Sequence, residues 1–439
     1  MSTLPKTYEA IREVVDSIPI VDTHEHIFAE EDWLKWKLDF GVFFRQYACV
    51  DLVSAGMPVA DMVTLQEDEN ATPEEKWKLM APYWKAAKNT AYCKLITMLI
   101  QDIYGLPDLN EDTYAELCQR MRQTQKPGFY RMILRDKANL AISINNDRGV
   151  KGTDWELMRP SDASDQFVLI RTAADIRFLT DSCQMPIYSV DDIVQAAAKT
   201  FEKRISEGAI AIKLGFAYQR IIQFDIVAKW KAEEVFAQVM RDDYLMRHDL
   251  GGERTFTELK PLQDYLMHQV VRVAADYNLP IQVHTGLLEG NGNYNAQTNP
   301  VHMTNVFMLY PQAKFDIFHI GYPYQSELGV LAKMFPNVYP DFCWAHVINP
   351  WAARQTLHEW LETVPGNKIL GFGGDYLFVE GAYAHSVIAR DNIARVLAEK
   401  VEYGYFDLDE AGRLAYDILR NNALRLFDLQ RFGIEPIEL

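Results

Sequence analysis

The 439-residue sequence has few cysteines, and their spacing gives no sign of pairing. The five cysteines are an odd number, lie far apart and form no C-x-x-C pair. Because disulfide frameworks and thiolate zinc sites need paired cysteines, neither is indicated, and we expect buried, reduced thiols.

Long apolar runs are also lacking. No run approaches the roughly 18 apolar residues of a membrane-spanning helix. Met1 to Thr7 leads into a helical pattern without the apolar core of a signal peptide. These absences argue against a membrane partner and predict a cytoplasmic protein.

Basic residues are the minority among the charged residues. The chain carries 44 lysines and arginines against 61 aspartates and glutamates, a net charge of -17. This excess repels phosphate backbones, so we expect no nucleic-acid partner. With 49% hydrophobic residues and no repeats or low-complexity tracts, the chain is an ordinary globular protein with a large core. Its length suits one large α/β domain with an elaboration, or two domains.

Eight short apolar, β-branched runs alternate with helical segments along the chain. They are Ile18–Val21, Leu140–Ile144, Phe167–Ile170, Ala209–Leu214, Ile281–Val283, Phe315–Phe318, Asn337–Tyr339 and Ile369–Phe372. Alternation of strands and helices favours a parallel sheet, and eight such units predict a closed (β/α)8 TIM barrel.

One interval breaks this rhythm. Roughly 110 residues separate the first two strands, about three times what a crossover helix needs. The interval contains helix signals such as Thr72 before Pro73. We interpret residues 30–137 as a helical insertion over the barrel mouth, and residues 1–29 and 138–439 as the catalytic barrel. The aromatic residues of the insertion (Trp33, Trp36, Phe43 and Phe44) are expected to form its core.

Ionisable side chains occur at the predicted strand ends, where a barrel places its active site. The H-x-H pair lies on one side of the first strand, because successive side chains alternate. The full set is His24, His26, Lys213, His284, His319 and Asp375. Imidazole and carboxylate ligands without thiolate suit zinc, with manganese or iron as alternatives. A metal in such a site lowers the pKa of bound water to about 7 and supplies hydroxide.

Lys213 needs its own explanation, because an ammonium group cannot bind a metal and is costly in an apolar run. Carbon dioxide can convert a lysine to a carbamate whose two oxygens bridge two cations. The alternative is a neutral or substrate-binding lysine beside a single metal. One or two divalent ions are therefore expected.

These motifs, in this order, resemble the amidohydrolase superfamily of metal-dependent enzymes. The family has H-x-H on strand 1, lysine on strand 4, histidines on strands 5 and 6 and aspartate on strand 8. The sequence shows Asp22–His26, Ala211–Lys213, Val283–Gly286, Phe318–Gly321 and Gly373–Asp375. Asn421–Phe427 also resembles the tail of the branch called amidohydrolase 2. The resemblance spans roughly residues 15 to 430.

The resemblance implies a role for each residue. His24 and His26 would bind one metal, His284 and His319 a second, and Lys213 as carbamate would bridge them. Asp375 would contact the first metal and the attacking hydroxide, and carry its proton to the leaving group. We expect His319 to be a catalytic residue together with Asp375. Asp22 would support the H-x-H segment or cap the strand.

The sequence also resembles uronate isomerase, a divergent member with a helical insertion after strand 1. Pro280–Gly286 and Arg171 carry this likeness. That enzyme's pattern lacks the strand-4 lysine and the strand-6 histidine, whereas this chain has Lys213 and His319. This departure from the uronate isomerase pattern favours hydrolysis over sugar isomerisation.

Several residues near the strand ends are candidates for contact with substrate. An arginine there can hold a carboxylate in two parallel hydrogen bonds, the alternative being a structural ion pair or a surface position. A tyrosine can donate to an oxyanion or simply pack. The candidates are Arg171, Tyr218, Arg220, Tyr322, Tyr324 and Trp344.

The sequence thus predicts a metal-dependent hydrolase that cleaves a C–N or C–O bond of a small carboxylated amide, lactam or lactone. One rival is a single-metal decarboxylase or uronate isomerase-like enzyme. Another is a non-catalytic module that keeps the metal for structure. The number of subunits stays open, a homo-oligomer included.

Overall fold

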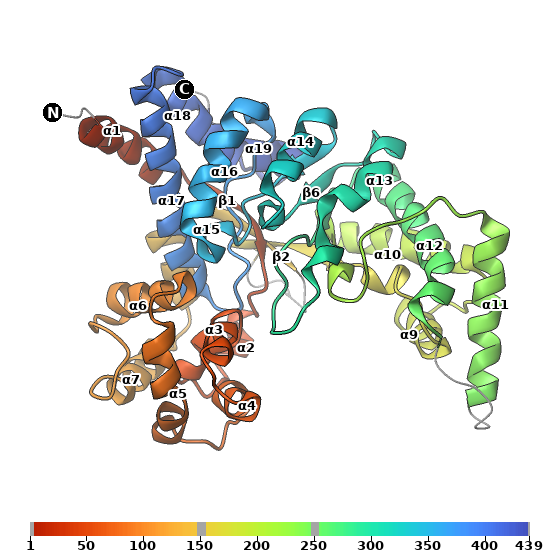
Figure 1. Ribbon diagram of the computed structural model, residues 1–439, viewed down its shortest axis with the longest axis horizontal. Helices are drawn as coiled ribbons and strands as arrows, with labels where there is room; N and C mark the ends of the chain where they lie inside the picture. The colour runs from red at the N-terminus through yellow and green to blue at the C-terminus, as the bar shows by residue number, and fades with distance from the viewer. Residues whose placement is uncertain (1–3, 147–154, 247–253, 438–439) are drawn as a thin grey trace.

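The computed structural model describes residues 4–146, 155–246 and 254–437. At its centre, the described residues form a seven-stranded parallel sheet in which each strand pairs with the next along the chain (Figure 1). The strands are β1 (Ile20–Glu25), β2 (Leu140–Asn146), β3 (Met158–Ala163), β4 (Ala211–Leu214), β5 (Ile281–Val283), β6 (Phe315–Ile317) and β7 (Val338–Pro340). The predicted parallel α/β class is confirmed.

The last predicted strand lies between β7 and β1. The amide of Leu370 donates to the carbonyl of Pro340 at 3.0 Å, and the amide of Thr23 donates to the carbonyl of Phe372 at 3.1 Å. A single bridge, between Asp341 and Leu370, stands where a longer ladder was expected. The glycine-rich sequence that follows Leu370 offers little side chain for a regular strand to pack. The segment nevertheless hydrogen-bonds to both ends of the curved sheet.

The prediction of a strand at Phe167–Ile170 was wrong. This run forms the 3-10 helix η3 (Asp165–Phe167) and a turn, in which the amides of Val168 and Leu169 donate to the Asp165 carbonyl at 2.9 and 2.8 Å. Its apolar side chains are buried as core rather than as a strand. The third strand is instead β3, whose polar sequence and Pro160 gave no strand signal.

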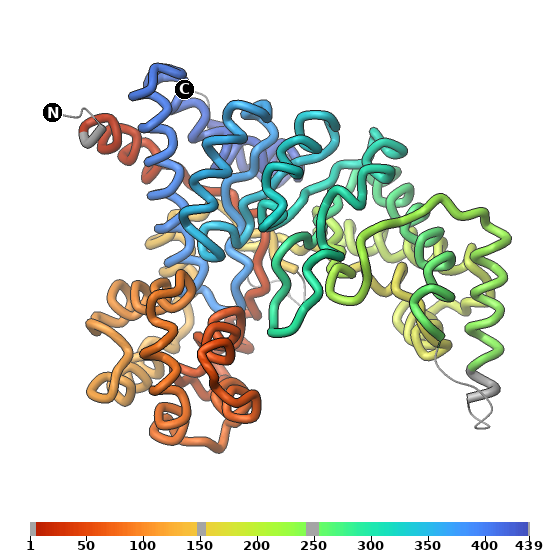
Figure 2. The backbone as a smooth tube through the Cα atoms, in the orientation of Figure 1, coloured from red at the N-terminus to blue at the C-terminus, as the bar shows by residue number. Residues whose placement is uncertain are grey.

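Helices follow the later strands (Figures 1 and 2). They are α9 (Ala173–Cys183), α10 (Val190–Ser206), α11 (Lys229–Met246), α12 (Phe256–Asp276), α13 (Thr304–Leu309), α14 (Gln325–Met334), α15 (Ala345–Ile348), α16 (Pro350–Thr363), α17 (Val379–Glu402), α18 (Leu408–Tyr416) and α19 (Asn422–Leu426). Ser189 caps α10, because its hydroxyl accepts from the Asp192 amide at 3.3 Å.

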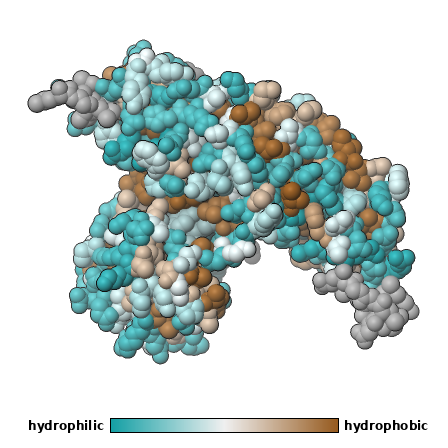
Figure 3. All heavy atoms as spheres, in the orientation of Figure 1, coloured by the Kyte–Doolittle hydropathy of each residue, from teal (hydrophilic) through white to brown (hydrophobic). Residues whose placement is uncertain are grey.

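The chain between β1 and β2 is helical. Its helices are α2 (Glu30–Trp33), η1 (Phe40–Phe44), α3 (Ala48–Ser54), α4 (Val59–Glu67), α5 (Pro73–Ala87), α6 (Ala91–Tyr104), α7 (Tyr114–Thr124), α8 (Phe129–Arg131) and η2 (Met132–Lys137). Trp33, Phe43 and Phe44 are buried in it, as expected for its core. Figure 3 shows a hollow between this helical group and the arm that carries α9, α11 and α12.

The helix α1 (Leu4–Ser17) precedes β1 and lies beside α17 and α18 (Figure 1). Residues 1–3 and 438–439, which belong to the predicted barrel segments, lie outside the described residues. Within the described part of the chain, no helix combines the length and apolar character needed to cross a membrane.

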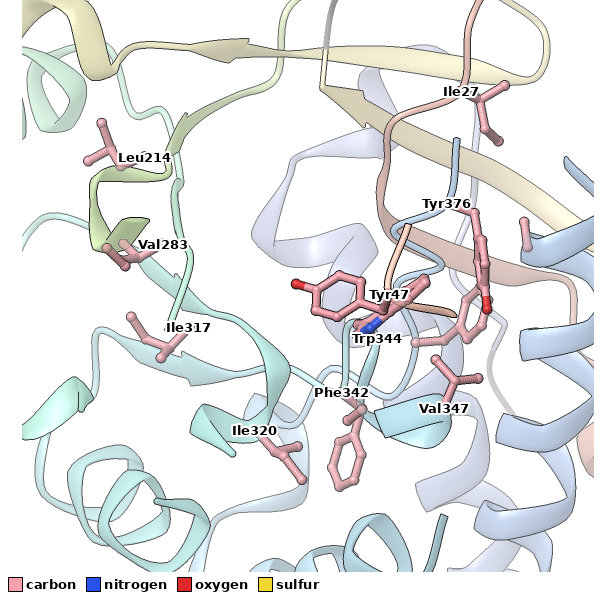
Figure 4. Close-up of a cluster of buried hydrophobic side chains, with 14 of the residues drawn as sticks. Ile27, Tyr47, Leu214, Val283, Ile317, Ile320, Phe342, Trp344, Val347 and Tyr376 are labelled. Carbon is pink, nitrogen blue, oxygen red and sulfur yellow. The ribbon is translucent and has the colours of Figure 1, made fainter. Parts of the chain in front are cut away.

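Two rows of side chains show how the central strands are oriented. Lys213, Gln282 and Asp316 are partners in the register of β4, β5 and β6. The next residues along these strands (Leu214, Val283 and Ile317) form a buried apolar row (Figure 4). Because side chains alternate along a strand, the two rows face opposite sides of the sheet. The polar row faces the metal-compatible residues.

Candidate metal centre

The H-x-H motif stands at the end of β1. The Nε2 atoms of His24 and His26 lie 3.3 Å apart. His24 is fully buried, whereas the His26 side chain is 21% exposed. The alternation of β1 therefore brings both imidazoles to one side of the strand, as the sequence predicted, with His26 toward the open side.

Asp375 lies against the same two imidazoles. Its Oδ1 is 3.1 Å from His26 Nε2 and 3.7 Å from His24 Nε2, and its Oδ2 is 3.9 Å from His319 Nε2. Burial alone would raise the pKa of Asp375, but the hydrogen bond and charge of His26, with the other two imidazoles, hold it well below its usual range. Asp375 is therefore an ionised carboxylate.

His284 and His319 form a second imidazole pair across β5 and β6. His319 Nε2 lies 3.1 Å from His284 Nδ1. The other nitrogen of each ring is within hydrogen-bond distance of a backbone carbonyl, Cys343 O at 2.8 Å from His319 Nδ1 and Leu287 O at 3.1 Å from His284 Nε2. Such contacts orient a ring and leave its free nitrogen for a metal.

The buried imidazoles are neutral at neutral pH. Burial lowers the pKa of His24 and His284 well below the usual value, and lowers that of His319 to about 4. His24 Nδ1 is 3.2 Å from the Gln282 side-chain oxygen, which leaves its Nε2 facing Asp375. Neutral imidazoles with one free nitrogen each, around an ionised carboxylate, fit a divalent cation.

Two overlapping groups of ligand atoms meet at Asp375. One is His24, His26 and Asp375, and the other is His319, Cys343 and Asp375, with all atoms of each group within 4.8 Å of one another. Cys343 is buried and unpaired, like three of the other four cysteines, and Cys183 is half-buried and unpaired, so the expectation of free thiols is confirmed.

Lys213 reaches the same place from β4. Its Nζ lies 3.7 Å from the centre of the Phe318 ring, and no hydrogen bond or ion pair joins it to another described residue. Burial lowers the pKa of Lys213, although the charge of Asp375 opposes the shift. A lowered pKa increases the fraction of neutral amine, the form that reacts with carbon dioxide.

The loop that carries Asp375 is held by β1 through three successive backbone amides. Gly374 N donates to Asp22 Oδ1 at 2.9 Å, Asp375 N to the His24 carbonyl at 2.7 Å, and Tyr376 N to Glu25 Oε2 at 2.7 Å. A Cβ at position 374 would lie 1.7 Å from Glu25 Oε1, so only glycine fits there. Asp22 thus supports both the H-x-H strand and the Asp375 loop.

Asp22 and Glu25 form a coupled pair of buried carboxyl groups. Burial raises the pKa of Asp22 to about 6. Burial and the adjacent charge of Asp22 raise the pKa of Glu25 well above its usual value. Burial therefore favours the protonated form of Glu25 beside Asp22.

A cavity of about 410 Å³ opens onto these residues. Its lining includes His26, Lys213, His284 and Asp375, together with Tyr218 from the predicted set. The remaining lining residues are Arg45, Gln46, Tyr47, Asn146, Asp165, Gly215, Glu289 and Leu377.

Both predicted arginines lie away from the cavity lining. The buried Arg220 donates to Asp264 at 2.6 Å and to Gln263 at 3.0 Å, which is a structural ion pair. Arg171 is exposed just before the capping residue of α9. The expectation that Arg171 faces the barrel mouth depends on the strand predicted at Phe167–Ile170, which the structure replaces with a 3-10 helix and a turn.

Of the predicted aromatic residues, Tyr218 lines the cavity and the others do not. The Tyr218 hydroxyl is 3.3 Å from that of Tyr47, and its ring packs on His284 at 4.6 Å. Tyr322 and Tyr324 are not among the cavity-lining residues, and the Tyr324 hydroxyl donates to Asn295 O at 3.2 Å. Trp344 is buried beneath Tyr47, with ring centres 5.0 Å apart (Figure 4).

Some residues of the site carried little sequence signal. Arg45, Gln46 and Tyr47 follow η1, far along the chain from every predicted strand end. Gln282 had a usable signal, because a polar residue between Ile281 and Val283 interrupts an apolar strand. Its amide bridges His24 Nδ1, the Thr23 carbonyl and Asp316.

Comparisons with known proteins agree with the fold and identify the family. The sequence pattern of the family described as Amidohydrolase (Amidohydro_2) matches residues 185–429, more than half of the chain. The protein belongs to this family, which confirms the resemblance seen in the motifs.

Relatives and solved structures extend the comparison. Protein fluG of Emericella nidulans is 33% identical over 179 residues, which are 39% of this chain and 20% of that protein. Uronate isomerase of Thermotoga maritima has a TM-score of 0.79 at 16% identity, with 96% of this chain and 97% of that chain covered. A putative metal-dependent hydrolase of Lactobacillus casei has a TM-score of 0.65 at 18% identity, with 96% and 98% covered. At these identities the structures show the shared fold alone.

Proposed function

We propose that the protein is a metal-dependent hydrolase that cleaves a C–N or C–O bond of a small, carboxylated amide, lactam or lactone. The observation that carries the proposal is the convergence of four imidazoles and one ionised carboxylate beside a buried lysine, at a cavity of about 410 Å³.

The metal ligands proposed are those that face this centre. His24 and His26 would hold one divalent ion and His284 and His319 a second, with Lys213, as carbamate, as a ligand shared by both. The lowered pKa of Lys213 and its lack of an ion pair among the described residues support the carbamate. Zinc suits such nitrogen and oxygen ligands, as do manganese and iron. A bound divalent ion supplies a Lewis acid that polarises the scissile bond and acidifies water.

Asp375 is the proton carrier in this proposal. Its carboxylate is ionised, lines the cavity and contacts His26. It accepts the proton of the attacking water and donates it to the leaving nitrogen or oxygen. His319, held through Nδ1 by the Cys343 carbonyl, keeps its Nε2 directed toward Asp375 and fixes the geometry of the site.

The proposal extends to the architecture. The hydrogen bonds of Leu370 and Phe372 to both neighbours support an eight-unit barrel. Residues 30–137 are then an insertion at its mouth, and the presence of Arg45, Gln46 and Tyr47 in the cavity lining supports that placement.

The experiment is a hydrolysis screen of the metal-loaded protein against N-acyl amino acids, lactams and lactones, read by mass spectrometry. We expect release of an amine or alcohol by the wild type and none by Asp375→Asn. Interconversion of uronates or loss of carbon dioxide, without hydrolysis of any compound, would support the single-metal rival instead.

A further inference from the structure

The cavity contains an arginine that neither strand-end spacing nor family motifs pointed to. Arg45 follows η1 in the helical chain between β1 and β2, and it lines the same cavity as His26, Lys213 and Asp375. Arg45 and Lys213 are the lysine or arginine side chains among the described residues of this lining. Lys213 is buried at the metal centre, so Arg45 is the cation available to a group farther out.

Arg45 is held in a way that leaves part of its guanidinium group available. Its Nε donates to the Gln66 carbonyl at 3.2 Å, and its guanidinium carbon lies 5.0 Å from the centre of the Trp36 ring. Neither terminal nitrogen has a hydrogen bond or ion pair with another described residue. A guanidinium held at Nε and along one face presents a fixed fork of donors, the geometry that matches a carboxylate.

Neighbouring contacts fix Arg45 relative to the metal centre. The Gln46 side chain donates to the Asp375 carbonyl at 2.8 Å and accepts from the Leu377 amide at 3.0 Å. Tyr47 packs on Trp344 with ring centres 5.0 Å apart (Figure 4). The residues directly after Arg45 are therefore docked on the loop that carries Asp375.

The other two candidate arginines, Arg220 and Arg171, are not available to a ligand in the cavity. The side chains of Arg220 and its partner Asp264 are each 1% exposed, so this arginine has no free face for a ligand. Arg171 is exposed and does not line the cavity. An anionic substrate in this cavity therefore meets Arg45 before any other arginine of the described chain.

We propose that Arg45 binds a carboxylate of the substrate and so sets the distance between that carboxylate and the bond that is cleaved. The inference rests on the proposed hydrolase function. It narrows the substrate class to small molecules that carry a carboxylate a fixed, short distance from the reacting amide or ester. It also makes the chain between β1 and β2 responsible for that choice.

The test uses the metal-loaded full-length protein and two sets of probes that it cannot hydrolyse. One set is the dicarboxylates from malonate to adipate. The other is the matching methyl ketones, such as 4-oxopentanoate for succinate. Both members of a pair share one carboxylate for the metal centre, and they differ only in the group that reaches Arg45. Binding is measured by calorimetry for the wild type, Arg45→Met, Arg45→Lys and the matched control Arg171→Met.

We expect at least one dicarboxylate to bind the wild type about 10- to 100-fold more tightly than its ketone, the range for a charge-assisted hydrogen-bonded pair. Arg45→Met should abolish this preference, Arg45→Lys should retain part of it, and Arg171→Met should retain all of it. Metal content and thermal unfolding of each variant show whether its centre is intact. Metal-loaded, folded Arg45→Met that keeps the preference would overturn the inference, as would a wild type with no preference at any chain length.

The two proposals fail in different ways. Hydrolysis with an unchanged preference in Arg45→Met removes the role of Arg45 and leaves the hydrolase. A preference that depends on Arg45, in a protein that hydrolyses nothing and isomerises a uronate, keeps Arg45 as the anion site and removes the hydrolase.

Discussion

The backbone amide of Tyr376 donates a hydrogen bond of 2.7 Å to Oε2 of Glu25, a buried side chain between the two histidines of the H-x-H motif. This contact, with those of Gly374 and Asp375 to the same strand, fixes the Asp375 loop against His24 and His26, the first proposed pair of metal ligands. Residues outside the proposed ligand set thus determine the position of Asp375.

Replacing Glu25 tests this positioning. Glu25→Ala removes the acceptor for Tyr376 and should weaken metal affinity by about 10- to 100-fold, the usual cost of losing a group that orients ligands. Glu25→Gln should stay close to wild type, because a glutamine of the same shape can still accept from the Tyr376 amide. The measurement is competition with a zinc-binding dye. Equal affinities for the two variants would contradict the positioning role.

Gly374 offers an independent test of the same contact. In Gly374→Ala the new methyl group would collide with Glu25 Oε1, so the free energy of unfolding should fall by about 1–3 kcal/mol, as for other overpacked sites. Glu25→Ala removes the colliding carboxyl group, so the double variant should lose less than the sum of the single losses. Denaturant unfolding measures all three. Additive losses would show that the collision is not with Glu25.

Removal of the metal should abolish activity while the protein stays folded. The buried imidazoles of His24, His284 and His319 are neutral without a metal, and the core is a continuous apolar cluster around them, so their burial carries little charge penalty. Far-ultraviolet circular dichroism after dialysis against a chelator should match that of the loaded protein. Global unfolding on chelation would instead indicate a structural metal.

Asp375→Asn should retain metal and lose turnover. Asparagine keeps an oxygen for His26 but cannot carry a proton, and general acid–base catalysis contributes typically 10²–10⁴-fold to a rate. Metal content by mass spectrometry and kcat on any substrate from the hydrolysis screen provide the check. A metal-loaded variant with undiminished kcat would exclude Asp375 as the proton carrier.

His346, which lies outside the metal ligands, should make a contribution to stability that is lost on acidification. Burial lowers its pKa to about 4, while its Nε2 lies 3.0 Å from the Gly371 carbonyl. The unfolded chain, with a pKa of about 6.5, binds this proton more readily than the folded protein. The contribution is present above pH about 6.5 and is lost as pH falls toward 4, by about 3 kcal/mol in all.

Urea unfolding between pH 4 and 7 measures this slope. His346→Gln should reduce the dependence of the unfolding free energy on pH in that window, whatever its effect at pH 7. A variant with the wild-type slope would assign the acid sensitivity to other buried groups.

The sequence allowed the centre to be predicted better than its surroundings. His24, His26, His284, His319 and Asp375 follow apolar runs, and parallel strands bring such ends together whatever the loops do. β3 could not be predicted, because Pro160 and the polar residues of this segment give no strand pattern. Its pairing with β2 and β4 stabilises the strand. The partner of Arg220 is 44 residues away, so sequence alone could not separate a buried ion pair from a substrate contact.

The proposed function depends on a two-metal centre bridged by a carbamate on Lys213. The most direct test counts divalent ions per chain by mass spectrometry and looks for a carbamate carbon by nuclear magnetic resonance after exposure to carbon-13-labelled bicarbonate. We predict two ions and a carbamate signal that is absent from Lys213→Ala. One ion per chain with an unmodified Lys213 would contradict the account.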